Sequence, residues 1–332
     1  MRRLGRPAAG LAAMTVLTVL GLTASGCVTV HGELEVVPSA TKAEAARALK
    51  DFTDAYNKAD KAYDPALDAG RVTGALGAIN QAGLKARSVT NPAGNPAHRP
   101  LELTDAAFTI PEKAGWPRWF VANADSNRDT DRGAGDTRWL MVFVRGGVDQ
   151  LWEVAYLNIV APADIPAFET GAEGWAEPVA PDSAAVAVAP KNLSEEYASY
   201  LQTGRPAHFT AGPHTSLWRV ERQKVARRPG LSTQFLDQAL DTGDFAPLGL
   251  ATEDGGALVF FATRFYDRQT AAKGYRPTVN PDVRALMTGE VRSTLTKEWV
   301  SSQVVRVKPS GAAADQVTVL GRLQGVVSAT GS

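Results

Sequence analysis

The chain contains a single cysteine, Cys27, which directly follows an uncharged, apolar leader. One thiol cannot form an internal disulfide or a cysteine-rich metal site. Exported proteins often rely on disulfides, so whatever follows Cys27 must be stable through packing alone. The 332-residue chain is long enough for that, because roughly 100–200 residues suffice for a domain with its own core. We therefore expect two domains without covalent cross-links.

The first 26 residues have the parts of an export signal. Three arginines within the first six residues supply the positive start, and residues 7–24 contain no charged side chain. This apolar part is short and rich in Ala, Gly and Thr, unlike a membrane-spanning helix of about 20 apolar residues. Small residues precede the cysteine, and this pattern predicts cleavage between Gly26 and Cys27.

The run Ala24-Ser25-Gly26-Cys27 resembles the bacterial lipobox. The resemblance implies a diacylglyceryl group on the Cys27 thiol and acyl chains such as palmitate. Lipoboxes usually carry leucine where this chain has Ala24, and a conventional secretory signal or an uncleaved anchor is the alternative. Two long acyl chains anchor stably, because each buried methylene contributes about 0.8 kcal/mol. We therefore expect an extracytoplasmic protein at the outer face of the cell membrane, with residues 27–40 as a lipidated tether.

The composition is that of an ordinary globular protein. Hydrophobic residues make up 44% of the chain and charged residues 21%, which argues against a disordered or fibrous protein. Lys and Arg together number 35, and so do Asp and Glu. Because nucleic-acid binding needs a basic excess, we expect no nucleic-acid partner.

The first half reads as helices followed by strands. Thr41 and Glu44 form a capping box, and apolar residues then recur at helical spacing up to position 63. A second helix is predicted over 72–84. Aromatic and β-branched runs then predict three strands, at 119–121, 138–144 and 151–160. We assign residues 41–162 to a first α+β domain.

The second half repeats this order after a linker. Residues 163–190 are rich in Pro and Ala and carry acids without Lys or Arg, which predicts an acidic linker. Residues 191–332 form the second predicted α+β domain. Its predicted helices are the segment capped by Asn192, a short helix over 235–240, and a helix from Pro281 closed by Gly289. Its predicted strands lie at 216–220, 258–266, 299–307 and 317–327.

The sequence therefore predicts an α+β chain of two helix-plus-antiparallel-meander domains in tandem, with duplication of one unit as a further hypothesis. A helix pair followed by a curved meander resembles the cone-shaped domains of nuclear transport factor-like and polyketide cyclase-like proteins. The chain as a whole, with the run from Gly26 to Gly32 after its leader, is similar to an actinobacterial family of secreted lipoproteins whose function is not known. That resemblance implies a location but no activity.

One loop has the spacing of a calcium site. Asp125, Asn127, Asp129 and Asp131 place oxygen ligands at alternate positions, as a hard cation requires. An EF-hand loop would have glycine at the sixth position, where this chain has Thr130, and its flanks would be helices instead of strands. A polar hairpin loop without a bound ion is the alternative, because Asp and Asn are common turn residues. No other cofactor is indicated.

A basic segment is the second candidate site, and it could bind an anionic surface such as phospholipid headgroups or a wall polymer. The alternatives are a solvated charged face and an internal contact with the acidic linker. The basic residues of this segment are Arg219, Arg222, Lys224, Arg227 and Arg228.

Catalytic motifs of the common types do not occur in the sequence. It has neither the GxSxG of serine hydrolases nor a phosphate-binding glycine loop after a strand. We therefore expect a non-enzymatic envelope lipoprotein that binds a partner protein or a small apolar ligand. Two alternatives remain open: an extracytoplasmic enzyme that uses a cone-shaped cavity, and a structural spacer that contacts the cell wall.

Overall fold

The structure, a computed structural model, describes residues 35–332. The predicted export signal, the cleavage site between Gly26 and Cys27, and the first part of the tether lie outside the described residues. Within the described part, no helix has an eighteen-residue stretch apolar enough to cross a membrane.

The first half contains a small antiparallel sheet covered by two helices. Its strand order is β2-β4-β5-β6. Helix α1 packs on one face of this sheet, and α2 packs against β6 and against two strands of the second half. The bounds are α1 Lys42–Ala62, α2 Gly74–Thr90, β2 Leu103–Thr109, β4 Arg118–Ser126, β5 Arg138–Arg145 and β6 Glu153–Val160.

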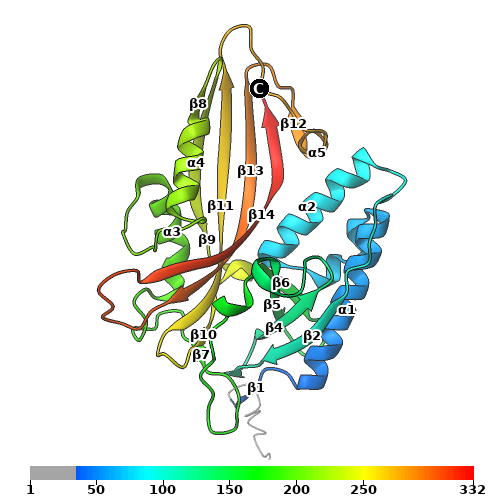
Figure 1. The fold of residues 1–332 in the computed structure, drawn as a ribbon. Coiled ribbons are helices and arrows are strands. Elements are labelled where there is room, and N and C mark those ends of the chain that lie inside the picture. The colour runs from blue at the N-terminus through cyan, green and yellow to red at the C-terminus, as the bar shows by residue number, and fades with distance from the viewer. Residues whose placement is uncertain (1–34) are drawn as a thin grey trace, which may run out of the picture.

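The second half is dominated by a larger sheet that curls into a half-barrel (Figure 1). Its long central strands follow the order β14-β13-β11, and β9 and β10 pair with the two ends of β11. All these pairings are antiparallel, and only the short β12 runs parallel to its neighbour β14. The bounds are β7 Pro178–Val179, β8 Arg227–Arg228, β9 Leu231–Leu240, β10 Leu248–Ala251, β11 Ala257–Ala271, β12 Met287–Gly289, β13 Thr294–Val307 and β14 Val317–Gly331.

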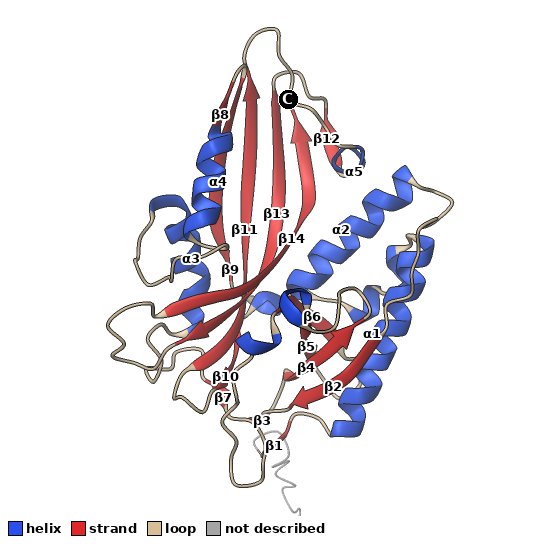
Figure 2. Cartoon of the chain, viewed as in Figure 1, coloured by secondary structure: helices blue, strands red, loops and turns tan. Residues whose placement is uncertain are grey.

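Three further helices border this sheet (Figure 2). Helices α3, Leu193–Thr203, and α4, Ser216–Ala226, pack on β9, whereas α5, Pro281–Ala285, packs on α2 and β14. The predicted α+β class with curved antiparallel sheets is thus confirmed. The tandem cone-shaped units and their duplication stay predictions.

Helix α1 begins where the sequence predicts. The Thr41 hydroxyl accepts the Glu44 backbone N–H at 3.1 Å, and the Glu44 carboxylate accepts the Thr41 backbone N–H at 2.8 Å. These two bonds satisfy donors that the first turn of a helix otherwise leaves unpaired. The accepted backbone hydrogen bond is the main reason that the pKa of Glu44 is lowered.

The hydrophobic core joins the two halves. One face of the small sheet packs on α1, and its other face packs on the large sheet. Trp119 and Tyr156 from the first half share this second cluster with Phe260 and Val304 from the second half. The opposite face of the large sheet packs on α3. The molecule is therefore layered as helix, sheet, sheet and helix.

The segments predicted as tether and linker are partly folded. Strand β1, Val36–Pro38, pairs with β3, Glu112–Ala114, so the last part of the predicted tether belongs to the body. In the predicted linker 163–190, Val179 pairs with Gly249 of the large sheet. The division into domains 41–162 and 191–332 around this segment stays a prediction.

Two elements of the second half differ from their prediction. Residues 216–220 were expected as a strand and form the start of α4, whereas residues 235–240 were expected as a helix and belong to β9. The inner face of α4 contains Arg222, which is buried, so the apolar period of this helix is interrupted by a charged residue. In β9, Leu236 faces solvent while its neighbour Phe235 faces a cavity, which is the alternation of a strand.

The predicted helix from Pro281 is also shorter than expected. Asn280 caps it by accepting the Asp282 backbone N–H at 2.8 Å, as predicted. It ends at Ala285, however, and Gly289 belongs to β12, where its backbone lies against Gly331.

Candidate binding cleft

The half-barrel holds two adjoining cavities, which we call the cleft. Lys297, Trp299 and Gln324 line both cavities, so the two lie side by side. Helix α4 and the start of β9 border the first, of about 230 Å³, whereas α2 and α5 border the second, of about 500 Å³. Together they reach the size range of small-molecule sites, roughly 300–1,000 Å³.

The floor of the cleft is aromatic. Phe265 of β11 and Trp299 of β13 are direct cross-strand partners, and their rings stack with centroids 5.5 Å apart and planes within 7°. Phe235 of the neighbouring strand lies 6.5 Å from Phe265. Trp218 of α4 lines the same cavity. Aromatic side chains at this density provide a large apolar contact surface with little conformational freedom to lose.

A buried carboxylate lies within this aromatic floor. Asp267 is only 6% exposed, and one of its oxygens accepts the Trp299 indole N–H at 2.9 Å and lies 3.0 Å from the Lys297 ammonium. Its other oxygen has no hydrogen-bond partner, and neither has the Gln324 side-chain oxygen. Unsatisfied buried polar atoms are uncommon in folded proteins and mark sites where a ligand or water can complete the bonding.

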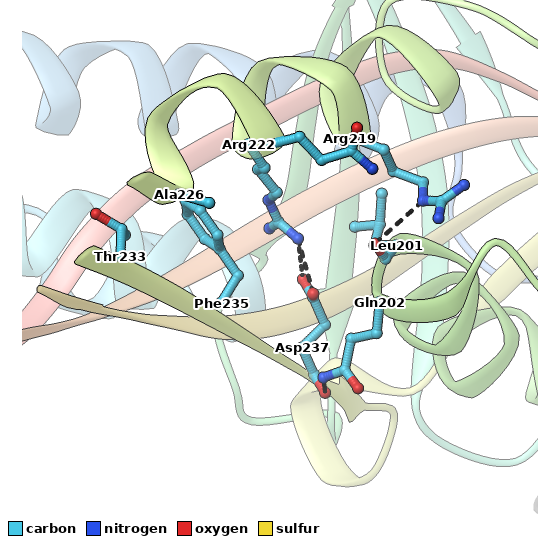
Figure 3. Close-up of a pocket in the computed structure, with 9 residues that line it drawn as sticks. Leu201, Gln202, Arg219, Arg222, Ala226, Thr233, Phe235 and Asp237 are labelled. Carbon is cyan, nitrogen blue, oxygen red and sulfur yellow. Dashed lines mark hydrogen bonds and ion pairs between the residues drawn. The ribbon is translucent and has the colours of Figure 1, made fainter. Parts of the chain in front are cut away.

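Arg222 fixes α4 onto the sheet (Figure 3). Its Nη1 lies 2.8 and 2.7 Å from the two Asp237 oxygens, and the side chains are 6% and 2% exposed. The guanidinium carbon also lies 5.2 Å from the Trp218 ring, 4.8 Å from Phe235 and 4.6 Å from Phe265. Burial raises the pKa of Asp237, and the Arg222 charge opposes this effect. The pair is thus a buried clamp between α4 and β9.

Two more titratable groups lie near this clamp. The Arg322 guanidinium lies 4.0 Å from the centre of the Trp218 ring. Burial lowers the pKa of Arg322, and burial together with the Arg322 charge lowers the pKa of His214. The Nδ1 atom of His214 is buried without a partner. The region beneath α4 is therefore rich in positive charge, with Asp237 as the counter-ion.

The predicted basic segment divides into three groups. Arg222 lies inside the clamp, and Arg219 hydrogen-bonds the Leu201 carbonyl oxygen at 3.3 Å and lines a third cavity of about 280 Å³ (Figure 3). Lys224 pairs with Glu221 of the same helix. Arg227 and Arg228 are exposed. None of the ion pairs within residues 35–332 joins this segment to the acidic linker, which the sequence left as an alternative.

Three of the four predicted calcium ligands come together. Carboxylate oxygens of Asp125, Asp129 and Asp131 lie within 4.8 Å of one another. Asn127 points elsewhere, because its side chain accepts the Glu102 backbone N–H at 3.1 Å and donates to the Pro100 carbonyl oxygen at 3.0 Å. One Asp129 oxygen accepts the Thr137 backbone N–H at 2.8 Å. These bonds stabilise the hairpin loop by themselves, and calcium binding stays a prediction.

Sequence reasoning did not identify the cleft residues Phe265, Asp267 and Gln324. They are spread over two strands more than fifty residues apart, and only the curl of the sheet brings them together. One signal was available. Asp267 follows Phe265 on the same face of β11, and a buried acid in a strand needs a partner.

Comparison with known proteins gives relatives over nearly the whole chain. Residues 36–331 match the family described as "Domain of unknown function (DUF8094)". The chain is 56% identical to an uncharacterized lipoprotein of Streptomyces coelicolor over 315 residues, which cover 95% of this chain and 93% of the relative. It is 52% identical to an uncharacterized lipoprotein of Streptomyces avermitilis over 332 residues, which cover 100% of this chain and 97% of the relative.

Proposed function

We propose that this chain, which belongs to the family described as Domain of unknown function (DUF8094), is an envelope lipoprotein. In this proposal it binds a small ligand in its cleft and catalyses no reaction. Its relatives in two Streptomyces species are named lipoproteins, which supports lipid anchoring. In this proposal the anchor is the Cys27 thiol, cleavage occurs after Gly26, and the body lies on the outer face of the membrane.

The observation that carries the binding proposal is the cleft itself. Its two cavities share Trp299, and the first also contains Phe265, which stacks on Trp299, and the buried Asp267 with one unpartnered oxygen. An apolar floor with a few fixed polar atoms is the usual composition of a small-molecule site. We therefore expect a ligand with a flat apolar body and at least one hydrogen-bond donor. A small ligand fits cavities of this volume better than a partner protein, which needs a wider contact area.

Binding is favoured over catalysis by the state of the acidic groups. Both oxygens of Asp237 are within hydrogen-bond distance of Arg222, and Asp267 is held by Lys297 and Trp299. A general base must be within reach of a substrate proton with an oxygen free to take it. The enzyme hypothesis would require the Asp237 pair to open, or it would use the one free oxygen of Asp267, whose carboxylate is already paired with the Lys297 ammonium.

Uptake of a neutral apolar dye, N-phenylnaphthylamine, tests the cleft. We expect saturable binding of one dye per chain, reported by dye fluorescence. Trp299→Ala removes half of the stacked floor and should weaken dye binding by about tenfold, which corresponds to about 1.4 kcal/mol.

A matched control is Tyr266→Ala, because Tyr266 is the neighbour of Phe265 on β11 but faces the other side of the sheet. This control should bind the dye as the unmodified chain does. Gln269→Trp is a second test, because a larger side chain at this position narrows the cleft. The Gln269 side chain makes no hydrogen bond to described residues. Non-saturable uptake, or equal loss in the Trp299 and Tyr266 variants, would contradict the proposal.

A further inference from the structure

A group of exposed cations surrounds one end of the half-barrel. The group comprises Arg227, Arg228, Lys273, Arg276, Arg284 and Arg292, which we call the distal cations. They come from four separate segments: β8, the connection from β11 to α5, α5 itself, and the connection from β12 to β13.

Hydrogen bonds hold these segments at the same end. The Ala272 N–H donates to the Gly230 carbonyl oxygen at 2.9 Å, which joins the β8–β9 turn to the connection after β11. The Arg292 N–H donates to the Ser332 carbonyl oxygen at 3.1 Å, which places the connection from β12 to β13 beside the end of β14. The Thr90 hydroxyl donates to the Asp282 carboxylate at 3.0 Å, which fixes α5 to the end of α2.

The distal cations have little opposing charge nearby. None of them takes part in a salt bridge with another described residue. Between Arg268 and Ser293 the chain contains only two acids, Asp282 and Glu290. Six unpaired cations in one region attract anions and repel one another, so their arrangement needs a reason other than stability.

The opposite end of the molecule is acidic. Strand β1, the first described strand after the predicted anchor, connects through Pro111, Ala176 and Val179 to the Val259 end of β11 (Figure 1). The distal cations lie at the other end of β11, near Thr270. Thr270 is eleven residues along the strand from Val259, which corresponds to about 36 Å at the usual rise per residue. The acids of the proximal end lie in the predicted linker: Asp164, Glu169, Glu173, Glu177 and Asp182.

We propose that the distal cations form a docking surface for a linear polyanion of the cell envelope, a polymer with repeated phosphodiester or carboxylate groups. Arg228 also lines the first cavity of the cleft, but the other five distal cations do not, so the proposal does not depend on the ligand in the cleft. It shares the assumption of an anchor at Cys27. An anchored chain would hold its acidic end toward the membrane and its basic end outward. The distal cations thus face the space beyond the membrane and not the lipid headgroups of the chain's own anchor.

Overall charge does not explain such binding. Removal of the three arginines in residues 1–26 leaves 32 cations against 35 acids, so the mature chain carries a net negative charge. A polyanion is therefore repelled by the molecule as a whole and attracted only by a local basic surface. Screening by salt would reduce this attraction steeply, because the cations are exposed.

The test uses the chain from residue 27 on with Cys27→Ala, purified without lipid, and long-chain polyphosphate as the probe. We expect binding that weakens at least tenfold when NaCl is raised from about 0.05 to 0.3 M. The double variant Lys273→Glu, Arg276→Glu should weaken binding at least tenfold at low salt. Neither side chain makes a hydrogen bond to a described residue, so the fold should be retained.

The matched control is the double variant Lys58→Glu, Lys61→Glu on α1, which makes the same change in total charge at exposed, unpaired positions. It should bind polyphosphate within about twofold of the unmodified chain. Equal loss in the two double variants, or no binding by the unmodified chain, would overturn the proposal. So would binding to phosphatidylglycerol vesicles but not to polyphosphate. Dye uptake should be unchanged in the Lys273, Arg276 variant, which separates this test from that of the cleft.

Discussion

At the scale of single residues, Arg222 shows how a charged side chain can act as a packing residue. It is buried against three aromatic rings, and its charge is balanced by Asp237 alone among its hydrogen-bond partners. A buried ion pair of this kind adds little net stability over a well-packed apolar pair, but loss of one partner leaves an uncompensated charge. The clamp therefore determines how α4 is positioned more than how stable the molecule is.

Substitution of the clamp should be strongly non-additive. Arg222→Met leaves the Asp237 carboxylate buried without its partner and should reduce the free energy of unfolding by about 3 kcal/mol. The double variant Arg222→Met, Asp237→Leu should recover most of this loss. Urea unfolding of the single and double variants measures the coupling. Additive losses would show that the pair does not act as a unit.

His214 should make stability depend on pH. Burial and Arg322 lower its pKa from the ordinary value of 6.5, so the unfolded chain takes up the proton first as pH falls. The contribution of His214 to the free energy of unfolding is fully present above the pKa that this histidine has in the unfolded chain. It is lost as the pH falls below that pKa, by up to about 1.4 kcal/mol per pH unit for one proton.

His214→Gln removes this proton and should flatten the pH dependence below about pH 6.5. Urea unfolding at several pH values measures it for both chains. Above that range the difference between the two chains should stay constant, because the histidine is neutral in both states. An unchanged slope at acidic pH would contradict the role assigned to His214.

At the scale of elements, the sequence predicted the helices and strands whose pattern of apolar residues is not interrupted. Helix α1 and strands β4, β5 and β6 lie at the predicted places, because each has one regular apolar face or a continuous apolar run. Helix α4 and strand β9 were assigned the wrong type. Arg222 in α4 and Asp237 in β9 lie on the buried faces of these elements, where they pair with each other. From the sequence alone, neither charged residue can be recognised as facing inward.

The cap of α1 gives a test at this scale. Thr41→Ala removes the side chain that accepts the Glu44 N–H and should reduce the free energy of unfolding by about 1 kcal/mol. Thr53→Ala, in the middle of the same helix, is the control and should be neutral or slightly stabilising, because alanine favours helix interiors. Thermal unfolding followed by circular dichroism compares the two. Equal effects would mean that the cap does not stabilise the helix.

At the scale of the whole molecule, the sequence predicted the α+β class and the likeness to lipoproteins, but not the cleft. The leader and Cys27 are contiguous, so they can be recognised in one segment. The cleft combines α2, α4, α5 and the strands β8, β9, β11, β13 and β14, and its residues become neighbours only through long-range pairing. Single-sequence periodicity carries no information about which strands pair.

The proposed anchor predicts where the protein is found. Cys27→Ala should move the chain from the membrane fraction to the soluble fraction, because both acyl chains are lost. Mass spectrometry of the unmodified chain should find a lipid-modified residue 27 at the mature amino terminus. The eight residue-to-residue steps from Cys27 to Glu35 reach at most about 28 Å, so the body would stay close to the membrane. An unmodified thiol or a different terminus would contradict the anchor.

The position of β14 has a consequence for the order of folding. This last strand in the sequence lies between β12 and β13, and the backbone N–H groups of residues 292–294 all donate to the Ser332 carbonyl oxygen. During synthesis, α1 and the small sheet emerge with all their strand partners, whereas the half-barrel lacks an inner strand until residues 317–331 leave the ribosome. The edge of β13 remains unpaired until then, and such an edge is the usual starting point of aggregation. Export of the chain, as proposed above, would therefore favour keeping it extended until translocation is complete.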